Sequence, residues 1–146
     1  MLKVTSRTAL STLLIVIMAG LATPALAFDH QQWDDLLGAH VSEHRDGVAS
    51  AVDYDGMASD QAALDDYLAR LSAVDNATFK GFSDAEKLAF LINAYNAFTV
   101  KLILKQDSRP DSIRDIGSIF SGPWSQRFFT LLGEERTLDE LEHQFV

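Results

Sequence analysis

A long apolar segment near the middle of the chain, residues 90–104, constrains the fold more than any other feature. Its residues are apolar on nearly every side of a helix, which is typical of a helix inside a domain. Two asparagines about one helical turn apart, Asn93 and Asn96, interrupt it. A buried amide without a partner costs about 1–3 kcal/mol. We therefore expect a buried central helix whose two amides find hydrogen-bond partners in the core.

The first 27 residues have the organisation of a secretory signal peptide. A short basic start is followed by a mostly apolar run over residues 9–21, and Ala25-Leu26-Ala27 supplies the small residues of a cleavage site. The apolar run is shorter than the ~20 residues that cross a membrane as a helix. The sequence therefore predicts a periplasmic or secreted protein that is cut before Phe28 and keeps no stable membrane anchor.

Composition limits the partners and the chemistry. The chain has 12 basic and 21 acidic side chains, and removal of Lys3 and Arg7 with the signal changes the formal net charge from −9 to −11. This acidic balance argues against nucleic acid and anionic lipid, and leaves an unknown small molecule or a protein as the partner. Cysteine is absent, so the sequence holds neither a disulfide nor a thiol nucleophile. The hydrophobic core must therefore supply the stability.

Apolar periodicity predicts one predominantly helical α+β domain over residues 28–146. The expected elements are a helix over 29–44, a strand over 48–54, a helix around 64–71 that starts after Ser59 or Asp60, the central helix over about 84–104, and a small hairpin near 127–137. The segment from residue 106 to the hairpin is rich in helix breakers and is expected to be loop.

Two capping boxes predict where helices begin. Ser83 with Glu86 marks the start of the central helix, and Thr137 with Glu140 opens a last helix. The sequence ends at Val146, only one or two turns into this amphipathic helix. Either this helix docks as a C-terminal cap or the sequence is truncated. We expect truncation, with the domain continuing beyond Val146.

Several short motifs occur in the order found in the family called domain of unknown function 547, which is present in bacteria and plants. The most specific are Asn93-Ala94-Tyr95-Asn96 and Glu142-His143. The others are Trp33-x-x-Leu36-Leu37, Val52-Asp53-Tyr54, Leu64-x-x-Tyr67-Leu68, Ser112-Ile113-Arg114-Asp115-Ile116, Pro123-Trp124 and Thr137-Leu138-Asp139-Glu140-Leu141. Over about residues 33–146 the chain resembles the N-terminal part of that domain. The resemblance implies a further portion with an Arg, a His and a Cys-bearing loop, and it implies no established activity.

Seven residues are candidates for a catalytic or binding site. His143 is the catalytic candidate, as a general base oriented by a carboxylate from another segment, and an exposed helical histidine is the alternative. The adjacent Glu142 would point about 100° away on a helix and would not bond to it directly. The binding candidates are Asn93, Asn96, Arg114, Asp115, Trp124 and Glu142.

Each binding candidate also has a structural interpretation. Arg114 and Asp115 form either an architectural ion pair or part of a site, and Trp124 either packs over the core or lines a groove. We expect the side of the central helix that carries the two asparagines to face the loop over residues 112–124. Irregular backbone there offers unpaired N–H and C=O groups, so at least one amide should bond to it.

The sequence gives no support for a metal or another cofactor. His40-Val41-Ser42-Glu43-His44 matches the H-x-x-E-H zinc pattern, but it lies at the end of the expected first helix, a poor place for a fixed site. The segment 53–56 hints at a calcium loop, but Ala51 and Ala62 would occupy positions that need oxygen ligands. We therefore expect no metal site.

Two functional hypotheses remain open, and the sequence does not decide whether the protein is an enzyme. The first is an exported binding or interaction module, in which Asn93 and Asn96 anchor loop backbone. The alternative is the front portion of an exported hydrolase-like enzyme whose nucleophile lies beyond Val146. In that case the two amides would orient a reacting group or donate to a developing oxyanion.

Overall fold

The computed structural model describes residues 27–44, 47, 49–106, 116 and 122–143. Within them the chain forms six α-helices, one 3₁₀ helix and two separate antiparallel hairpins. The elements are α1 (Gln31–His40), β1 (Val41–His44), β2 (Ala49–Val52), α2 (Tyr54–Ser59), α3 (Gln61–Ser72), α4 (Asn76–Gly81), α5 (Asp84–Leu104), η2 (Pro123–Ser125), β3 (Phe129–Leu131), β4 (Glu134–Arg136) and α6 (Leu138–Glu142). The expected class, predominantly helical α+β, is confirmed.

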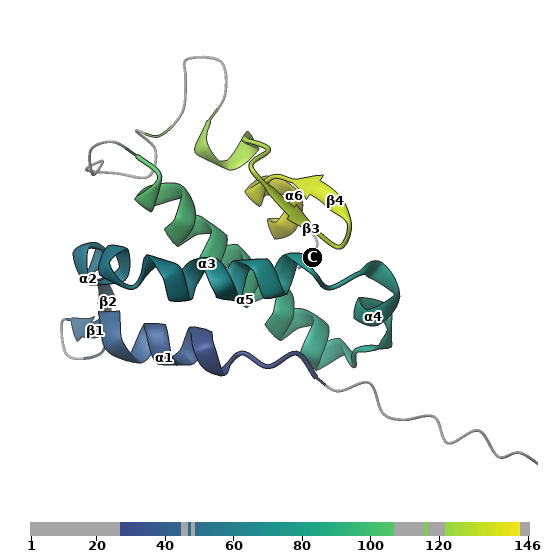
Figure 1. The fold of residues 1–146 in the computed structure, drawn as a ribbon, viewed down its shortest axis with the longest axis horizontal. Coiled ribbons are helices and arrows are strands. Elements are labelled where there is room, and N and C mark those ends of the chain that lie inside the picture. Colours follow the sequence, from purple (N-terminus) through teal and green to yellow (C-terminus); the bar gives the residue numbers. More distant parts are fainter. Residues whose placement is uncertain (1–26, 45–46, 48, 107–115, 117–121, 144–146) are drawn as a thin grey trace, which may run out of the picture.

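Helix α5 runs through the middle of the domain, as the apolar segment predicts (Figure 1). Helix α3 packs against both α1 and α5, and α6 packs against α5. The side chains of α5 that are buried in this way are Phe90, Leu91, Ala94, Ala97, Phe98, Val100, Leu102 and Ile103. By length and composition α5 is also the single described helix that is apolar enough to cross a membrane. Its place in the core accounts for that composition.

Both predicted capping boxes are present. At the start of α5 the Ser83 hydroxyl accepts a hydrogen bond from the Glu86 N–H at 3.3 Å, and the Glu86 carboxylate accepts one from the Ser83 N–H at 2.6 Å. At the start of α6, Thr137 and Glu140 make the same reciprocal pair at 3.1 Å each. Local sequence therefore fixes the first residue of the two helices that matter most for the candidate sites.

The expected first helix over residues 29–44 is wrong at its C-terminal end. Helix α1 stops at His40, and the next four residues form β1, which pairs with β2 so that Val41 lies opposite Val52. Continuing the helix over Ser42, Glu43 and His44 would bring no apolar side chain to the core. Pairing with β2 satisfies the same backbone groups without that helix. The expected strand over 48–54 is found as β2, but it ends at Val52, because Asp53 caps α2 and Tyr54 is the first residue of that helix.

Two short helices, α2 and α4, were not expected. Each begins after an aspartate that acts as its N-cap. The Asp53 carboxylate accepts hydrogen bonds from the N–H groups of Asp55 and Gly56, and the Asp75 carboxylate accepts one from Thr78 at 2.7 Å. Such caps are visible in a sequence. Helices this short have too little apolar periodicity to be recognised, however.

The second hairpin, β3–β4, is folded onto the core. Phe129 stacks on Phe98 of α5 with ring centroids 4.0 Å apart, and Leu131 is fully buried. The turn between the strands has two residues with positive φ, Leu132 at 56° and Gly133 at 82°. Two such residues match the twist of a tight hairpin. The hairpin expected near 127–137 is thereby confirmed.

Candidate functional site

Two of the candidate residues, Trp124 and Glu142, lie close to Tyr95 of α5. Its ring stacks against Trp124, with centroids 6.4 Å apart and planes 13° apart. Burial raises the pKa of the Tyr95 hydroxyl, and the negative charges of Glu142 and Asp139 on α6 raise it further. The result is an aromatic pair beside the acidic side of α6. Trp124, which is half-buried, thus packs against α5.

His143 lies at the C-terminal end of α6, where it is exposed. Its Nδ1 is 2.6 Å from the backbone carbonyl oxygen of Asp139. A carbonyl can only accept, so Nδ1 donates the proton and Nε2 carries the lone pair of the neutral ring. This geometry fits the exposed-histidine interpretation. It also leaves one nitrogen with the capacity of a base.

The expectation that both asparagines are buried is wrong. Asn96 is exposed and Asn93 is half-buried, and neither side chain bonds to another residue that the structure describes. The reason is the orientation of α5, whose outward side also carries Leu88 and Ile92, with exposed fractions of 47% and 42%. The Asn96 amide therefore reaches solvent, and Asn93 lies at the border of the core rather than inside it.

Part of the candidate set lies outside the described residues. Arg114 and Asp115 belong to the undescribed segment 107–115, and the loop expected to receive the amides falls mostly in it and in 117–121. The predicted contact between the asparagines and that loop therefore stays a prediction.

The zinc-like pattern is split between two elements. His40 ends α1, whereas Glu43 and His44 belong to β1. The Nε2 atom of His40 lies 2.7 Å from the carboxylate of Asp60. Within the described part of the chain, no three His, Cys, Asp or Glu side chains are grouped as metal ligands.

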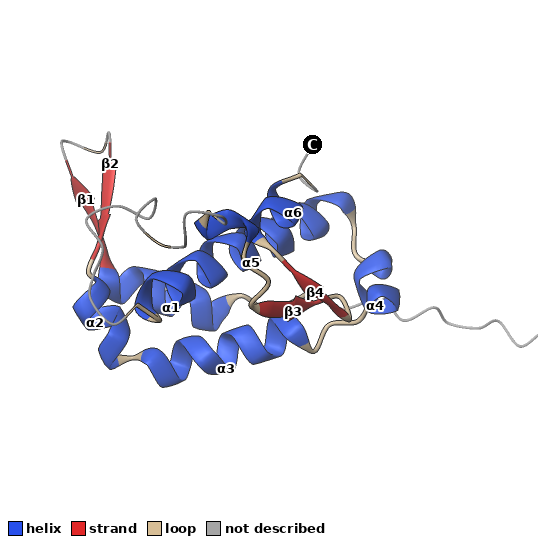
Figure 2. Ribbon diagram, turned by 90° about the horizontal axis from the view of Figure 1, so that it is seen from above, coloured by secondary structure: helices blue, strands red, loops and turns tan. Residues whose placement is uncertain are grey.

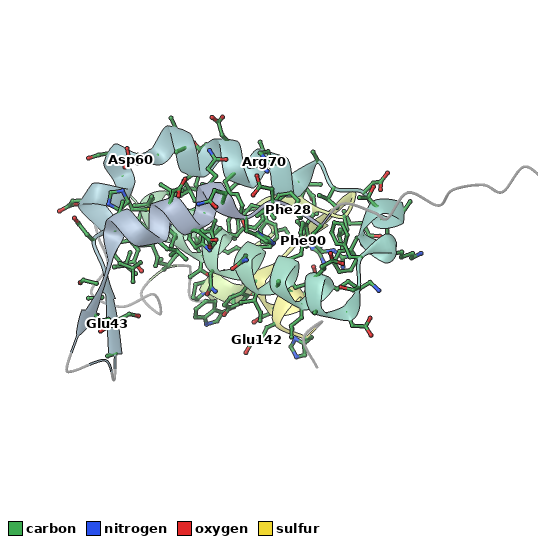
Figure 3. All side chains as sticks on the ribbon, turned by 90° about the horizontal axis from the view of Figure 1, so that it is seen from below. Phe28, Glu43, Asp60, Arg70, Phe90 and Glu142 are labelled. Carbon is green, nitrogen blue, oxygen red and sulfur yellow. The ribbon has the colours of Figure 1, made fainter. Side chains whose placement is uncertain are left out.

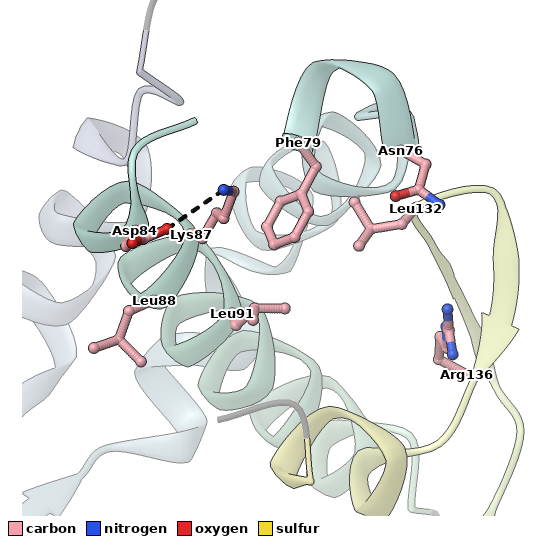
Figure 4. Close-up of a pocket in the computed structure, with 8 residues that line it drawn as sticks. All are labelled: Asn76, Phe79, Asp84, Lys87, Leu88, Leu91, Leu132 and Arg136. Atoms are coloured by element: carbon pink, nitrogen blue, oxygen red, sulfur yellow. Dashed lines mark ion pairs between the residues drawn. The ribbon is translucent and has the colours of Figure 1, made fainter. Parts of the chain in front are cut away.

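A pocket of about 450 Å³ lies between α4, α5 and the β3–β4 hairpin, and we call it the α4–α5 pocket (Figure 4). Its lining residues come from these elements and from the turn between the two strands. They are Asn76, Phe79, Asp84, Lys87, Leu88, Leu91, Leu132 and Arg136. The set combines apolar side chains with two cations, and none of the seven candidates predicted from sequence belongs to it.

The apolar part of this pocket is tied to the core. Phe79 contacts the rings of Phe82 and Phe90 at centroid distances of 6.0 and 5.5 Å, and Leu91 is buried. Leu132 is also buried, although its backbone has a φ of 56°. A left-handed conformation costs a leucine roughly 1–2 kcal/mol. The tight β3–β4 turn requires this backbone, and it holds the Leu132 side chain at the pocket against the local preference of a leucine.

The two cations of the pocket have exposed partners. Lys87 lies 3.5 Å from the carboxylate of Asp84, which is fully exposed, and Arg136 lies 2.7 Å from that of Glu134, which is 65% exposed. Ion pairs with exposed groups contribute only about 0–1 kcal/mol. Both cations can therefore exchange these partners for a ligand anion at little cost.

A second pocket, of about 570 Å³, lies between α3, α5 and the start of β3. Phe98, Phe128 and Phe129 form its aromatic part. Its two lysines already have partners: Lys101 lies 2.5 Å from the carboxylate of Asp65, and Lys105 lies 5.5 Å from the centroid of the Phe128 ring.

The α4–α5 pocket has almost no signature in the sequence. Leu88 and Leu91 look like ordinary core positions of an apolar helix, and Arg136 sits among acidic residues of a predicted hairpin. One usable signal was Gly133, because a glycine after Leu132 marks a tight turn that brings β4 back alongside β3. Nothing in the sequence, however, says that this turn meets α4.

A comparison with protein families gives a match. The family model described as "Protein of unknown function, DUF547" matches residues 79–146. The curated proteins and the solved structures yield no match. The matched segment holds the Asn93–Asn96 and Glu142–His143 motifs, while the motifs before residue 79 lie outside it. It also holds every lining residue of the α4–α5 pocket except Asn76. The resemblance to the domain of unknown function 547 family is confirmed, and residues 79–146 carry it.

Proposed function

We propose that this protein is an exported binding module and that the α4–α5 pocket is its binding site. The observation that carries the proposal is the composition of this pocket, in which apolar side chains lie together with Lys87 and Arg136. Its volume of about 450 Å³ is within the range of roughly 300–1,000 Å³ that is usual for small-molecule sites. The match to residues 79–146 favours it over the second pocket, four of whose lining residues precede that segment.

Binding can be tested with a neutral apolar dye, Nile red, added to the protein without its first 27 residues. We expect its fluorescence to increase and to saturate with protein concentration. The variant Leu88→Trp enlarges an exposed residue of the lining and should abolish most of this signal. The matched control is Ala89→Trp, one residue further along the exposed side of α5 and outside the lining. Equal dye binding by both variants would rule out this pocket as the site.

Export is supported by the pattern of the first 27 residues, which lie outside the described structure except for Ala27. N-terminal sequencing of protein recovered from the periplasm or medium should begin at Phe28. Recovery of the protein only from the cytoplasm, with Met1 or the following segment retained, would contradict the proposal.

The hydrolase-like alternative rests on a different observation. The Nδ1 atom of His143 is fixed as a donor by the Asp139 carbonyl, and the stacked Tyr95 and Trp124 lie against α6. Under this alternative, Nε2 of His143 acts as the base for a nucleophile beyond Val146. Hydrolysis of p-nitrophenyl acetate by the complete reading frame should then fall at least about tenfold in His143→Gln. Activity that is unchanged in this variant would remove the alternative.

A further inference from the structure

We infer that the ligand of the α4–α5 pocket is a small straight-chain dicarboxylate, with one carboxylate at Lys87 and the other at Arg136. This inference rests on the proposed binding function and adds the chemical class of the ligand.

The first observation is the enrichment of cations in the lining of the pocket. Acidic side chains outnumber basic ones by 21 to 12 in the whole chain, yet the pocket is lined by two cations and one acid. That acid, Asp84, has a fully exposed carboxylate. Glu134, the exposed partner of Arg136, lies outside the lining. The wall of the pocket itself therefore carries more positive than negative side chains, and a ligand anion has to replace the two exposed partners.

The second observation is the placement of the cations. Lys87 belongs to α5 and Arg136 to β4, and Figure 4 shows them on opposite walls with apolar side chains between them. A ligand with a single carboxylate would engage one wall and leave its apolar end near the other cation. A ligand with a carboxylate at each end and methylenes between them matches both walls and the apolar surface of Phe79, Leu91 and Leu132.

The third observation concerns the type of each cation. Arg136 has only 21% of its side chain exposed, and its planar guanidinium can hold a carboxylate with two parallel hydrogen bonds. The Lys87 side chain is 31% exposed and supplies a point charge on a flexible stem, which can follow ligands of different length. The arginine should therefore fix one end of the ligand, and the lysine should accept the other.

Removing the exposed partners of the cations gives a test in which the affinity should rise rather than fall. Asp84 and Glu134 compete with the ligand for Lys87 and Arg136. The variants Asp84→Asn and Glu134→Gln should therefore bind a dicarboxylate more tightly, by up to about fivefold each. A variant that misfolds cannot produce this gain.

The main experiment measures calorimetric affinities for suberate, octanoate and octane-1,8-diol, which share an eight-carbon chain and carry two, one and no charges. Suberate should bind at least about tenfold more tightly than octanoate, and the diol should bind most weakly. Lys87→Gln and Arg136→Gln should each reduce suberate binding to the level of octanoate. Lys80→Gln, an exposed cation on α4 outside the lining, should change nothing.

Nile red separates failure of this inference from failure of the proposed function. If the dye binds and Leu88→Trp blocks it, but octanoate or the diol binds as tightly as suberate, the pocket is a binding site and the dicarboxylate class is wrong. If neither the dye nor suberate responds to Leu88→Trp, the proposed function itself is wrong. The preference for suberate should be lost in both cation variants while dye binding is kept. This result would support both the proposed function and the dicarboxylate class.

Discussion

The two β-hairpins have similar lengths and opposite surroundings. In β1–β2 the residues Ala49, Ser50 and Ala51 are all exposed, and Figure 2 shows the hairpin projecting away from the helices. In β3–β4 the residues Phe129 and Leu131 are buried, and β3 lies between α3 and α5. The backbone pairing is antiparallel in both. Side chains, rather than ladder hydrogen bonds, therefore distinguish a projecting hairpin from one that is part of the core.

The burial of β3–β4 explains why this hairpin, and not β1–β2, carries the pocket. A two-stranded hairpin alone is at best marginally stable in water, so β1–β2 offers no firm support for a site. The β3–β4 hairpin is held by its aromatic stack and by Arg127, which donates to the Glu135 carbonyl and pairs with Glu140 of α6. Leu132 and Arg136 can therefore be positioned accurately.

The largest expected difference is in global stability. Phe129→Ala removes a buried ring from the stack on Phe98 and should lower the free energy of unfolding by about 3–5 kcal/mol. Ser50→Ala in the projecting hairpin and Thr130→Ala on the exposed side of β3 should each change it by less than about 0.5 kcal/mol. Urea unfolding followed by circular dichroism measures all three. A large loss in Ser50→Ala would show that β1–β2 is part of the cooperative core.

Two glycines with nearly equal backbone angles give a finer test of whether each hairpin belongs to the cooperative core. Gly133 in the β3–β4 turn has a φ of 82°, and Gly47 between β1 and β2 has a φ of 83°. Alanine in this conformation costs roughly 1 kcal/mol at either position. Gly133→Ala should lower the free energy of unfolding by that amount. Gly47→Ala should instead raise the rate of amide exchange in β1 and β2 and leave global unfolding nearly unchanged. Equal global losses would contradict the comparison.

The smallest expected effect is a pH dependence of the core. Burial lowers the pKa of His30, whose Nδ1 lies 2.7 Å from the buried Tyr67 hydroxyl. The unfolded chain therefore binds more protons than the folded chain, and stability should fall as the pH drops through about 6.5 towards the lower folded pKa. Below that pKa this contribution should level off.

His30→Gln is the control for this pH dependence, because it keeps the carboxylates that also titrate in acid. The difference in urea midpoint between wild type and variant, measured from pH 8 to pH 5, isolates the histidine. Amide exchange in β1–β2 should show no matching difference, since His30 contacts Phe28, Tyr67 and Phe90 rather than that hairpin. If the difference in urea midpoint does not depend on pH, protonation of His30 is not coupled to folding.

Much of the fold could be predicted because its signals are local. The central helix was expected at about 84–104 and is observed at Asp84–Leu104, since a capping box marks its start and continuous apolar sequence fills it. The end of α1 could not be predicted in the same way. Whether Val41 continues a helix or starts a strand depends on β2, which lies eight or more residues later in the sequence.

The site was harder to predict because exposure depends on tertiary contacts. The sequence shows that Asn93 and Asn96 lie in an apolar helix, but only the packing of α3 and α6 determines which side of α5 stays open. The same packing leaves Leu88 exposed and buries Leu91, although both are leucines in one helix. The sequence left two interpretations of Trp124 open, packing over the core or lining a groove. Its stack on Tyr95 of α5 is a tertiary contact that no local pattern indicates.

The left-handed backbone of Leu132 has a consequence for any substitution at this position. If only the turn mattered, glycine or asparagine would suit it better than leucine, because both adopt that conformation readily. In this chain the leucine is buried, so its side chain contributes packing that neither glycine nor asparagine would supply. Replacing Leu132 would therefore relax the turn and empty part of the pocket wall at the same time.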